Sequence, residues 1–192
     1  MRCTSEVQRS NVLRHPITGT DAGRPSWQDE GTSRYNLAMI HITPIAYVRN
    51  SRRAVEDDFW GGLVSEIVMD PGFGEESIRG LEDFSHAKVT FHLHSVPDDK
   101  IVIGARHPRN NPAWPKVGIF AQRGKSRPNR LGLATVRILG RDGAVLRVQD
   151  LDAVDGTPVV DIKPVFREFL PKGEVREPPW AEELMRDYWN EP

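Results

Sequence analysis

The apolar residues of this chain fall into many short segments, and this pattern limits the fold more than any other feature. Residues typical of turns separate the segments, and Asp142-Gly143 indicates a two-residue hairpin turn. Many short strands with little helix favour an all-β fold, so we expect a small antiparallel β-barrel of about seven strands. The expected strands cover 40–48, 63–69, 86–96, 117–122, 131–139, 145–151 and 159–162.

The clearest alternation of apolar and polar residues runs through 86–96. Successive side chains of a strand point to opposite faces of a sheet, so alternation separates a core face from an outer face. We expect Ala87, Val89, Phe91 and Leu93 on the inner face and His86, Lys88, Thr90, His92 and His94 on the outer face.

Helical periodicity is limited to two short segments. Over 75–84, Ile78, Leu81 and Phe84 would share one face, and acidic residues stand at the start of the segment. This predicts one internal helix. A short amphipathic C-terminal helix is expected over 180–189, after two prolines.

Residues 1–38 differ from the rest of the chain. They are rich in Ser, Thr, Gly and Arg and have no sustained apolar period, so they cannot bury enough apolar area to offset their ordering entropy. We expect a disordered tail, and one hypothesis is that translation starts at Met39. The remaining chain is then a barrel domain over 39–168 and a C-terminal extension over 169–192 that carries the short helix.

The composition excludes some classes of protein. No apolar run approaches the roughly 20 residues that a membrane-spanning helix needs, so we expect no membrane partner. The single cysteine, Cys3, cannot form a disulfide within the chain, which is typical of a reducing compartment. We therefore expect a cytoplasmic location.

The formal net charge of −1 hides a strong segregation of charge. Between Lys100 and Arg141 the chain has ten Lys and Arg residues and no Asp or Glu, and an acidic turn with Asp152 and Asp155 follows. Because the local field attracts a polyanion, the basic segment predicts binding of single-stranded RNA. One interpretation is that Asp152 or Asp155 accepts hydrogen bonds from a ligand amine or ribose, and the alternative is a capped turn whose acids face solvent. The candidate RNA-binding residues are Arg106, Arg109, Lys116, Lys125, Arg127 and Arg130.

Two other patterns suggest different chemistry. Over 65–76 a glycine-containing turn follows a strand, but a proline interrupts it and no alternation of strands and helices follows, so a dinucleotide-binding fold is rejected. His86, His92 and His94 would line one face of a strand, and histidines in this arrangement can bind zinc or iron. The alternative is that they form ordinary hydrogen bonds at a polar barrel mouth.

Two long segments, GIFAQRGKSRPNRLGLATV over 118–136 and LDAVDGTPVVDIKP over 151–164, resemble the TsaA-like (TrmO) family. IRGLEDFSHAKVTFHLH over 78–94 extends the resemblance, which runs from about residue 42 to residue 164. It implies a small β-barrel that binds S-adenosylmethionine without a Rossmann fold, usually as a homodimer, and holds no metal. It also implies methylation of the exocyclic nitrogen of N6-threonylcarbamoyladenosine in the tRNA anticodon loop.

The same resemblance implies a set of site residues. His94 is the candidate catalytic group, because a carbamoylated amine is a poor nucleophile and benefits from a base or a carbonyl-polarising group. The segment over 57–62 departs from the family's usual Pro-Arg-Gln step, and RPNRLG over 127–132 departs from RPNPIG, so this is a divergent branch. The implied cofactor contacts are Phe59, Trp60, Gly61, His94, Ser95, Arg123, Leu133, Asp155, Gly156 and Thr157.

Three other functions remain open from the residues. A non-catalytic RNA-binding barrel would bind RNA with a steep salt dependence and no S-adenosylmethionine. A small-molecule methyltransferase would keep the cofactor and never contact RNA. A metal-dependent enzyme would use His86, His92 and His94.

Overall fold

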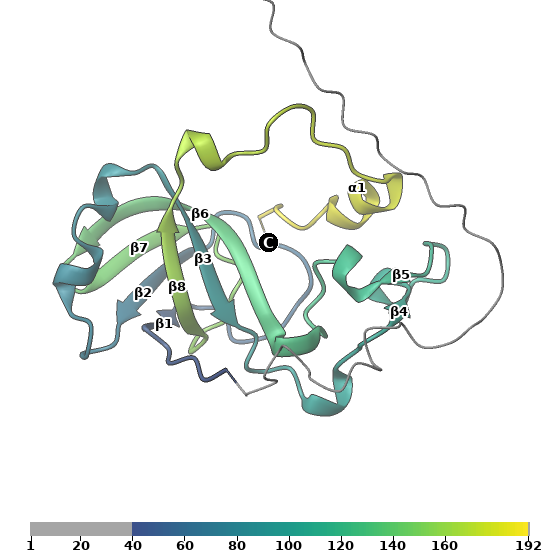
Figure 1. Ribbon diagram of the computed structural model, residues 1–192, viewed down its shortest axis with the longest axis horizontal. Coiled ribbons are helices and arrows are strands. Elements are labelled where there is room, and N and C mark those ends of the chain that lie inside the picture. The colour runs from purple at the N-terminus through teal and green to yellow at the C-terminus, as the bar shows by residue number, and fades with distance from the viewer. Residues whose placement is uncertain (1–39, 192) are drawn as a thin grey trace, which may run out of the picture. The chain divides into compact units, whose positions relative to one another are not determined.

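The computed structural model describes residues 40–191 (Figure 1). The expected tail over 1–38 and the hypothesis about Met39 lie outside these residues. The division into a barrel over 39–168 and an extension over 169–192 stays a prediction. Within the described range, no helix has the length and apolar character needed to cross a membrane.

A closed antiparallel barrel of six strands forms the fold, in the order β1-β2-β7-β6-β3-β8. The expected all-β barrel is therefore confirmed, with six barrel strands in place of about seven. The strands are β1 (Ala46–Arg49), β2 (Val64–Met69), β3 (His86–His92), β6 (Leu131–Asp142), β7 (Val145–Gln149) and β8 (Pro158–Pro164).

The expected barrel strand over 117–122 is wrong. The chain forms only a two-residue strand there, β5 (Val117–Gly118), which pairs with β4 (Ala105–Arg106) outside the barrel and leads into a 3-10 helix, Ile119–Ala121. The buried side-chain amide of Gln122 donates to the carbonyl oxygens of Arg106 and Val117, at 3.0 and 2.9 Å. The Gln122 side chain therefore makes hydrogen bonds to backbone oxygens that a neighbouring strand would make in a longer sheet.

The expected internal helix over 75–84 is also wrong as one element. The segment contains two 3-10 helices, Glu75–Ile78 and Leu81–Asp83. Gly80 lies between them with a φ of 87°, a left-handed conformation that a helix does not tolerate and that glycine adopts easily. Ile78 is nevertheless buried against the core, and Leu81 packs there in part, so the apolar face was recognised correctly.

The remaining short elements lie between and after the barrel strands. Gly143, with a φ of 55°, stands in the two-residue turn between Asp142 and Val145, so the hairpin turn lies one residue later than expected. The C-terminal helix α1 (Pro179–Met185) begins as expected and is shorter than the predicted 180–189. The other 3-10 helices are Asp98–Lys100, Pro108–Asn110, Pro128–Arg130 and Arg167–Phe169.

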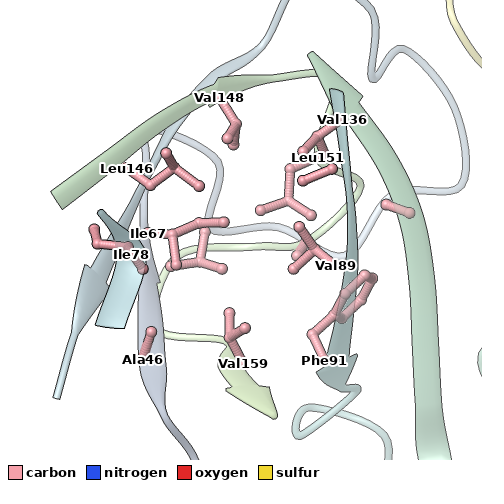
Figure 2. Close-up of a cluster of buried hydrophobic side chains, with 14 of the residues drawn as sticks. Ala46, Ile67, Ile78, Val89, Phe91, Val136, Leu146, Val148, Leu151 and Val159 are labelled. Atoms are coloured by element: carbon pink, nitrogen blue, oxygen red, sulfur yellow. The ribbon is translucent and has the colours of Figure 1, made fainter. Parts of the chain in front are cut away.

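The core lies inside the barrel (Figure 2). The alternation in β3 is confirmed, because Ala87, Val89 and Phe91 are buried and their neighbours are not. Gly132 on the paired strand β6 leaves room for Phe91, since a Cβ on this glycine would stand 2.3 Å from the ring. Figure 2 shows Val89 and Phe91 of β3 on the same side of the interior as Val136 of β6.

Candidate functional site

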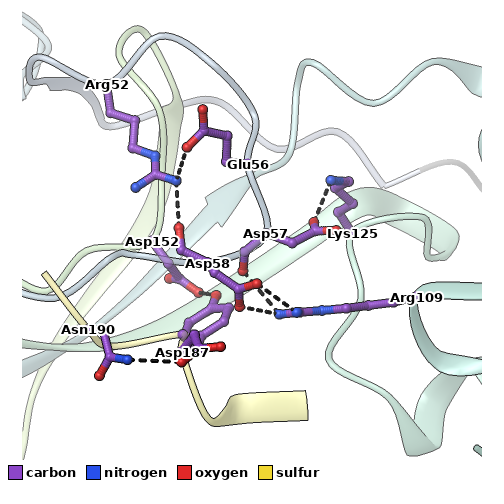
Figure 3. A network of polar contacts seen from close by, with 10 residues as sticks. Arg52, Glu56, Asp57, Asp58, Arg109, Lys125, Asp152, Asp187 and Asn190 are labelled. Atoms are coloured by element: carbon purple, nitrogen blue, oxygen red, sulfur yellow. Dashed lines mark hydrogen bonds and ion pairs between the residues drawn. The ribbon is translucent and has the colours of Figure 1, made fainter. Parts of the chain in front are cut away.

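The candidate site lies where three loops and the C-terminal segment meet. The loops cover 50–63, 105–130 and 150–157, and the C-terminal segment that reaches them is Asp187–Glu191. Figure 3 shows Asp57 and Asp58 of the first loop facing Lys125 and Arg109 of the basic segment.

Arg52 holds the first loop in shape. Its guanidinium donates to the backbone oxygens of Phe59, at 2.5 Å, and Asp58, at 2.7 Å, and pairs with Glu56 at 3.1 Å. It also lies 3.9 Å from the centre of the Trp60 ring, a cation–π contact. Sequence reasoning missed Arg52, although its spacing of four residues from Glu56 was a visible signal.

The three predicted cofactor residues of this loop contact the protein's own C-terminal segment. The N–H groups of Phe59 and Trp60 donate to the carbonyl oxygens of Asp187 and Tyr188, at 3.2 and 2.8 Å. Gly61 packs so closely that a Cβ would stand 1.9 Å from the carbonyl oxygen of Trp189. Phe59 and Gly61 also line a cavity of about 580 Å³, together with Ser51, Arg52, Arg53, Ala54, Glu56, Gly62, Leu63 and Glu191.

The basic segment is tied to the acidic end of the first loop. Arg109 donates to both carboxylate oxygens of Asp58, at 2.8 and 2.6 Å, and Lys125 contacts Asp57 at 2.7 Å. Two of the six predicted RNA-binding residues are therefore paired with carboxylates of the first loop. The segregated charges visible in the sequence partly neutralise each other in the fold.

The other four predicted RNA-binding residues have different surroundings. Arg106 donates to the side chain of Asn110 at 2.9 Å, and Arg127 donates to the carbonyl oxygen of Gln122 at 3.3 Å. Arg130 pairs with Asp98 at 2.8 Å, and Lys116 is exposed. The assignment of these six residues to RNA stays a prediction.

The predicted turn Asp155-Gly156-Thr157 clamps the end of β1. The Asp155 carboxylate accepts from the N–H of Asn50, at 3.1 Å, and from Arg53, at 2.8 Å. Gly156 has a φ of 78°, and its N–H donates to Val48 at 2.8 Å, so the turn conformation was predicted correctly. Thr157 is buried. Both oxygens of Asp155 have partners within the protein, which fix the turn on the end of β1.

Asp152 is the most unusual acid of the same loop. Its Oδ2 accepts a hydrogen bond from the hydroxyl of Tyr188 at 2.6 Å, while its buried Oδ1 has no partner among the described residues. Burial raises the pKa of Asp152, and the Tyr188 hydrogen bond and the charge of Arg123 oppose that rise. Burial also raises the pKa of Tyr188, and the Asp152 charge adds to this effect.

Arg123 and Leu133, both predicted cofactor contacts, lie together, because the Arg123 guanidinium donates to the carbonyl oxygen of Leu133. The charge of Arg123 influences both Asp152 and Tyr188. Arg123 of the basic segment therefore lies close enough to the acidic turn for its charge to act on Asp152. The sequence identified Asp152 as a possible acceptor, whereas Tyr188 was missed, since nothing in its local sequence indicates a distant partner.

The histidines at the end of β3 lie beside the 105–130 loop, because the N–H of Leu93 donates to the carbonyl oxygen of Arg130 at 2.7 Å. His94 and Ser95 are exposed, and the hydroxyl of Ser95 lies 3.2 Å from Nε2 of His94. The pKa of His92 is lowered, first by burial and then by the charges of Arg130 and His94.

The histidine face cannot form a single metal site. At about 3.3 Å per residue, β3 separates His86 from His92 by roughly 20 Å, so His86 cannot share an ion with His92 and His94. The described residues contain no group of three or more potential metal-ligating side chains. The hypothesis of a three-histidine metal enzyme is therefore wrong.

Comparison with known proteins gives a consistent relationship. The family described as tRNA-methyltransferase O N-terminal domain matches residues 56–169. A probable S-adenosyl-L-methionine-binding protein of Pyrococcus abyssi is 36% identical, over 57% of this chain and 56% of that protein. A protein of the same description from Methanothermobacter thermautotrophicus is 36% identical over 67% of this chain and 92% of its own length. The tRNA (adenine(37)-N6)-methyltransferase of Escherichia coli is 39% identical over 50% of this chain and 43% of that enzyme.

Solved structures support the same fold. A crystal structure of TrmO from Pseudomonas aeruginosa matches with a TM-score of 0.57 and 26% identity, over 72% of this chain and 62% of that chain. The match spans little more than half of the Pyrococcus protein and less than half of the Escherichia enzyme. Residues 170–191 lie beyond the range that the family matches.

Proposed function

This chain belongs to the tRNA-methyltransferase O N-terminal domain family, and on that premise we propose that it is an S-adenosylmethionine-dependent methyltransferase acting on tRNA. The observation that carries the proposal is the extent of the family match. Residues 56–169 include five of the six barrel strands, the basic segment and the acidic turn. A catalytic domain requires both the scaffold and its loops, and both lie in the matched range.

The residues near Asp152 fit a cofactor with hydrogen-bond donors. A buried carboxylate oxygen without a donor, Oδ1 of Asp152, requires a donor to offset its lost hydration. Arg123 lies close enough for its charge to lower the pKa of Asp152, so cation and carboxylate face one region. When bound, S-adenosylmethionine supplies the methyl group from its sulfonium. The predicted contacts at Arg123, Leu133 and the 155–157 turn would bind and orient it.

Positioning accounts for most of the rate in such a reaction. Direct displacement of a methyl group needs donor and acceptor in line and little covalent help from the protein. The proposed acceptor is the exocyclic nitrogen of N6-threonylcarbamoyladenosine beside the tRNA anticodon. A carbamoylated nitrogen is a weak nucleophile, and His94, exposed beside Ser95, is the proposed base or polarising group. The modified base must leave its stack to reach the site.

The proposed partner is the anticodon loop of tRNA, and the basic segment is proposed to bind it. Among the six predicted RNA-binding residues, Arg106, Lys116 and Arg127 have no carboxylate contact within the described residues. A cytoplasmic location belongs to the same proposal, because tRNA modification takes place where tRNA is found. A homodimer belongs to it as well, as the family resemblance implies.

Two measurements test the proposal together. Calorimetry with S-adenosylmethionine should give stoichiometric binding to the purified full chain. Nucleoside mass spectrometry of tRNA from a strain lacking the gene should then show loss of the N6-methyl form of N6-threonylcarbamoyladenosine. Binding of RNA without any binding of the cofactor would favour a non-catalytic RNA-binding barrel. Cofactor binding with unchanged tRNA nucleosides would keep the methyltransferase and reject the tRNA substrate.

A further inference from the structure

The C-terminal segment returns to the candidate site from beyond the family-matched range. Helix α1 is attached through Glu183, whose carboxylate accepts from the indole N–H of Trp114 at 2.8 Å. The following residues reach the first loop through the backbone hydrogen bonds of Phe59 and Trp60. Tyr188 then contacts Asp152 in the third loop. The stretch from Glu183 to Tyr188 therefore contacts all three loops of the site.

The placement of Tyr188 is closely determined. Its own carbonyl oxygen accepts from Trp60 at 2.8 Å, and the neighbouring Trp189 carbonyl occupies the space that a Cβ on Gly61 would need. The rings of Tyr188 and Trp189 pack edge to face, 4.9 Å apart. Backbone bonds, steric fit and ring packing together direct the Tyr188 hydroxyl toward Asp152, so this contact is part of a built arrangement.

The two oxygens of Asp152 differ in their surroundings. Oδ2 is engaged by Tyr188, and Oδ1 is buried without a donor among residues 40–191. The hydrogen bond to Tyr188 does not account for the burial of Oδ1. A buried carboxylate oxygen normally has a hydrogen-bond donor, and this one lies where the charge of Arg123 acts on it. A hydrogen bond to one oxygen fixes the rotation of the carboxylate and therefore the direction of the other.

We propose that Tyr188 is a positioning residue for Asp152, and that it directs Oδ1 of Asp152 to accept a hydrogen bond from an amino or hydroxyl group of the bound ligand. This proposal rests on the proposed function, with S-adenosylmethionine as the ligand. Tyr188 acts through Asp152 and supplies from the C-terminal segment a contact that the family-matched residues do not contain.

The test measures S-adenosylmethionine affinity by calorimetry with the full chain. Tyr188→Phe keeps the ring and removes the hydroxyl, and Asp152→Asn keeps the shape and removes the charge. Tyr188→Phe should weaken binding by about tenfold and Asp152→Asn by more, as expected for a hydrogen bond to a charged group. The matched control is Tyr47→Phe, which removes a hydroxyl from an exposed tyrosine of β1 and should leave the affinity unchanged.

Two readouts separate positioning from a structural role. In the Asp152→Asn background, Tyr188→Phe should cause little further loss, because its effect passes through the carboxylate. In wild type the affinity should fall as Asp152 becomes protonated, and Tyr188→Phe should move that midpoint to higher pH, since the Tyr188 bond and Arg123 both favour the charged form. A purely structural role would leave the midpoint in place. If Tyr188→Phe does not fold, as thermal melting will show, Asp152→Asn carries the test of the ligand contact.

The outcomes distinguish this proposal from the one it rests on. Absence of binding to wild type rejects both. Binding to wild type with unchanged or stronger binding to Tyr188→Phe rejects only the positioning role. Repeating the titrations with 5′-methylthioadenosine, which lacks the amino-acid group, locates the donor. An equal loss in Asp152→Asn for both compounds places it on the nucleoside, and a loss for S-adenosylmethionine alone places it on the amino group.

Discussion

The guanidinium of Arg109 donates to both carboxylate oxygens of Asp58, at 2.8 and 2.6 Å, and this pair joins the basic segment to the loop after β1. Arg109 reaches this position from a left-handed backbone conformation, with a φ of 48°. A residue other than glycine is uncommon in that conformation, and the pair with Asp58 helps to hold Arg109 in it. The pair therefore stabilises the contact between the 105–130 loop and the 50–63 loop.

Arg109→Gln should lower the free energy of unfolding by about 1 kcal/mol. The bidentate geometry strengthens the ion pair. Both side chains keep roughly a quarter of their surface exposed, so solvent partly screens the two charges. Urea denaturation of the full chain measures the change. Lys116→Gln, at an exposed position of the same segment, serves as control and should leave the free energy of unfolding within about 0.5 kcal/mol of wild type.

Gly132→Ala should destabilise the barrel by about 1–3 kcal/mol through overpacking. The new methyl group would stand 2.3 Å from the Phe91 ring, on the paired strand, and the ring is buried. Gly104→Ala is the matched control, because no atom lies within 4 Å of the corresponding Cβ position. Thermal melting should give a lower melting temperature for Gly132→Ala than for Gly104→Ala. Equal melting temperatures would contradict the tight contact between β3 and β6.

The pKa of Asp152 leads to a pH dependence of defined sign. Burial raises this pKa above its ordinary value of 3.8, so the folded state favours the neutral acid. The resulting stabilisation is fully present below the unfolded pKa and is lost as pH rises through the folded pKa. Asp152→Asn should therefore lose stability relative to wild type at low pH and recover it as pH rises.

Urea denaturation from about pH 3 to pH 8 tests this difference. Glu82→Gln provides a control of opposite sign. The hydrogen bond from Arg141 lowers the pKa of Glu82, so its contribution is present above the unfolded pKa and is lost as pH falls. Parallel curves for Asp152→Asn and wild type would show that the folded environment does not perturb Asp152.

The sequence predicted the barrel because local patterns and long-range packing agree there. In β3, polar and apolar residues alternate, and each inward residue is buried by strands β6 and β8. The prediction failed at 117–122, where the buried Gln122 amide bonds to two backbone oxygens, and at Gly80, whose left-handed conformation divides an apparent helix. Each failure has a single cause, the buried Gln122 in the first case and Gly80 in the second. The spacing of apolar residues gives no information about either effect.

The site was predictable only in part, for a similar reason. Composition and resemblance point to the acidic turn and to Arg123, and their assignment to the site stays a prediction. Arg52 and Tyr188 were missed because their roles depend on partners that the fold brings together. Tyr188 lies 36 residues from Asp152 in the chain, and no local spacing reports that contact.

The pairing of the basic segment with Asp57 and Asp58 leads to a prediction about RNA. Each free cation that neutralises a phosphate contributes about 1 to the slope of log affinity against log salt. Lys116→Gln should therefore lower that slope by about 1 in binding of an anticodon stem-loop. Arg109→Gln should lower it by less, because Asp58 already neutralises that charge. Filter binding over a range of salt concentrations measures both slopes.

The reverse change sharpens the same prediction. Removing both carboxylates, in Asp57→Asn with Asp58→Asn, frees Lys125 and Arg109 for phosphate and should raise RNA affinity at low salt and steepen the slope. Asp161→Asn is the control, because Asp161 pairs with Lys163 on β8 and not with the basic segment. This change should leave the slope as in wild type. If the Asp57/Asp58 variant bound RNA no better than wild type, Lys125 and Arg109 would not contact RNA, and their predicted role would be rejected.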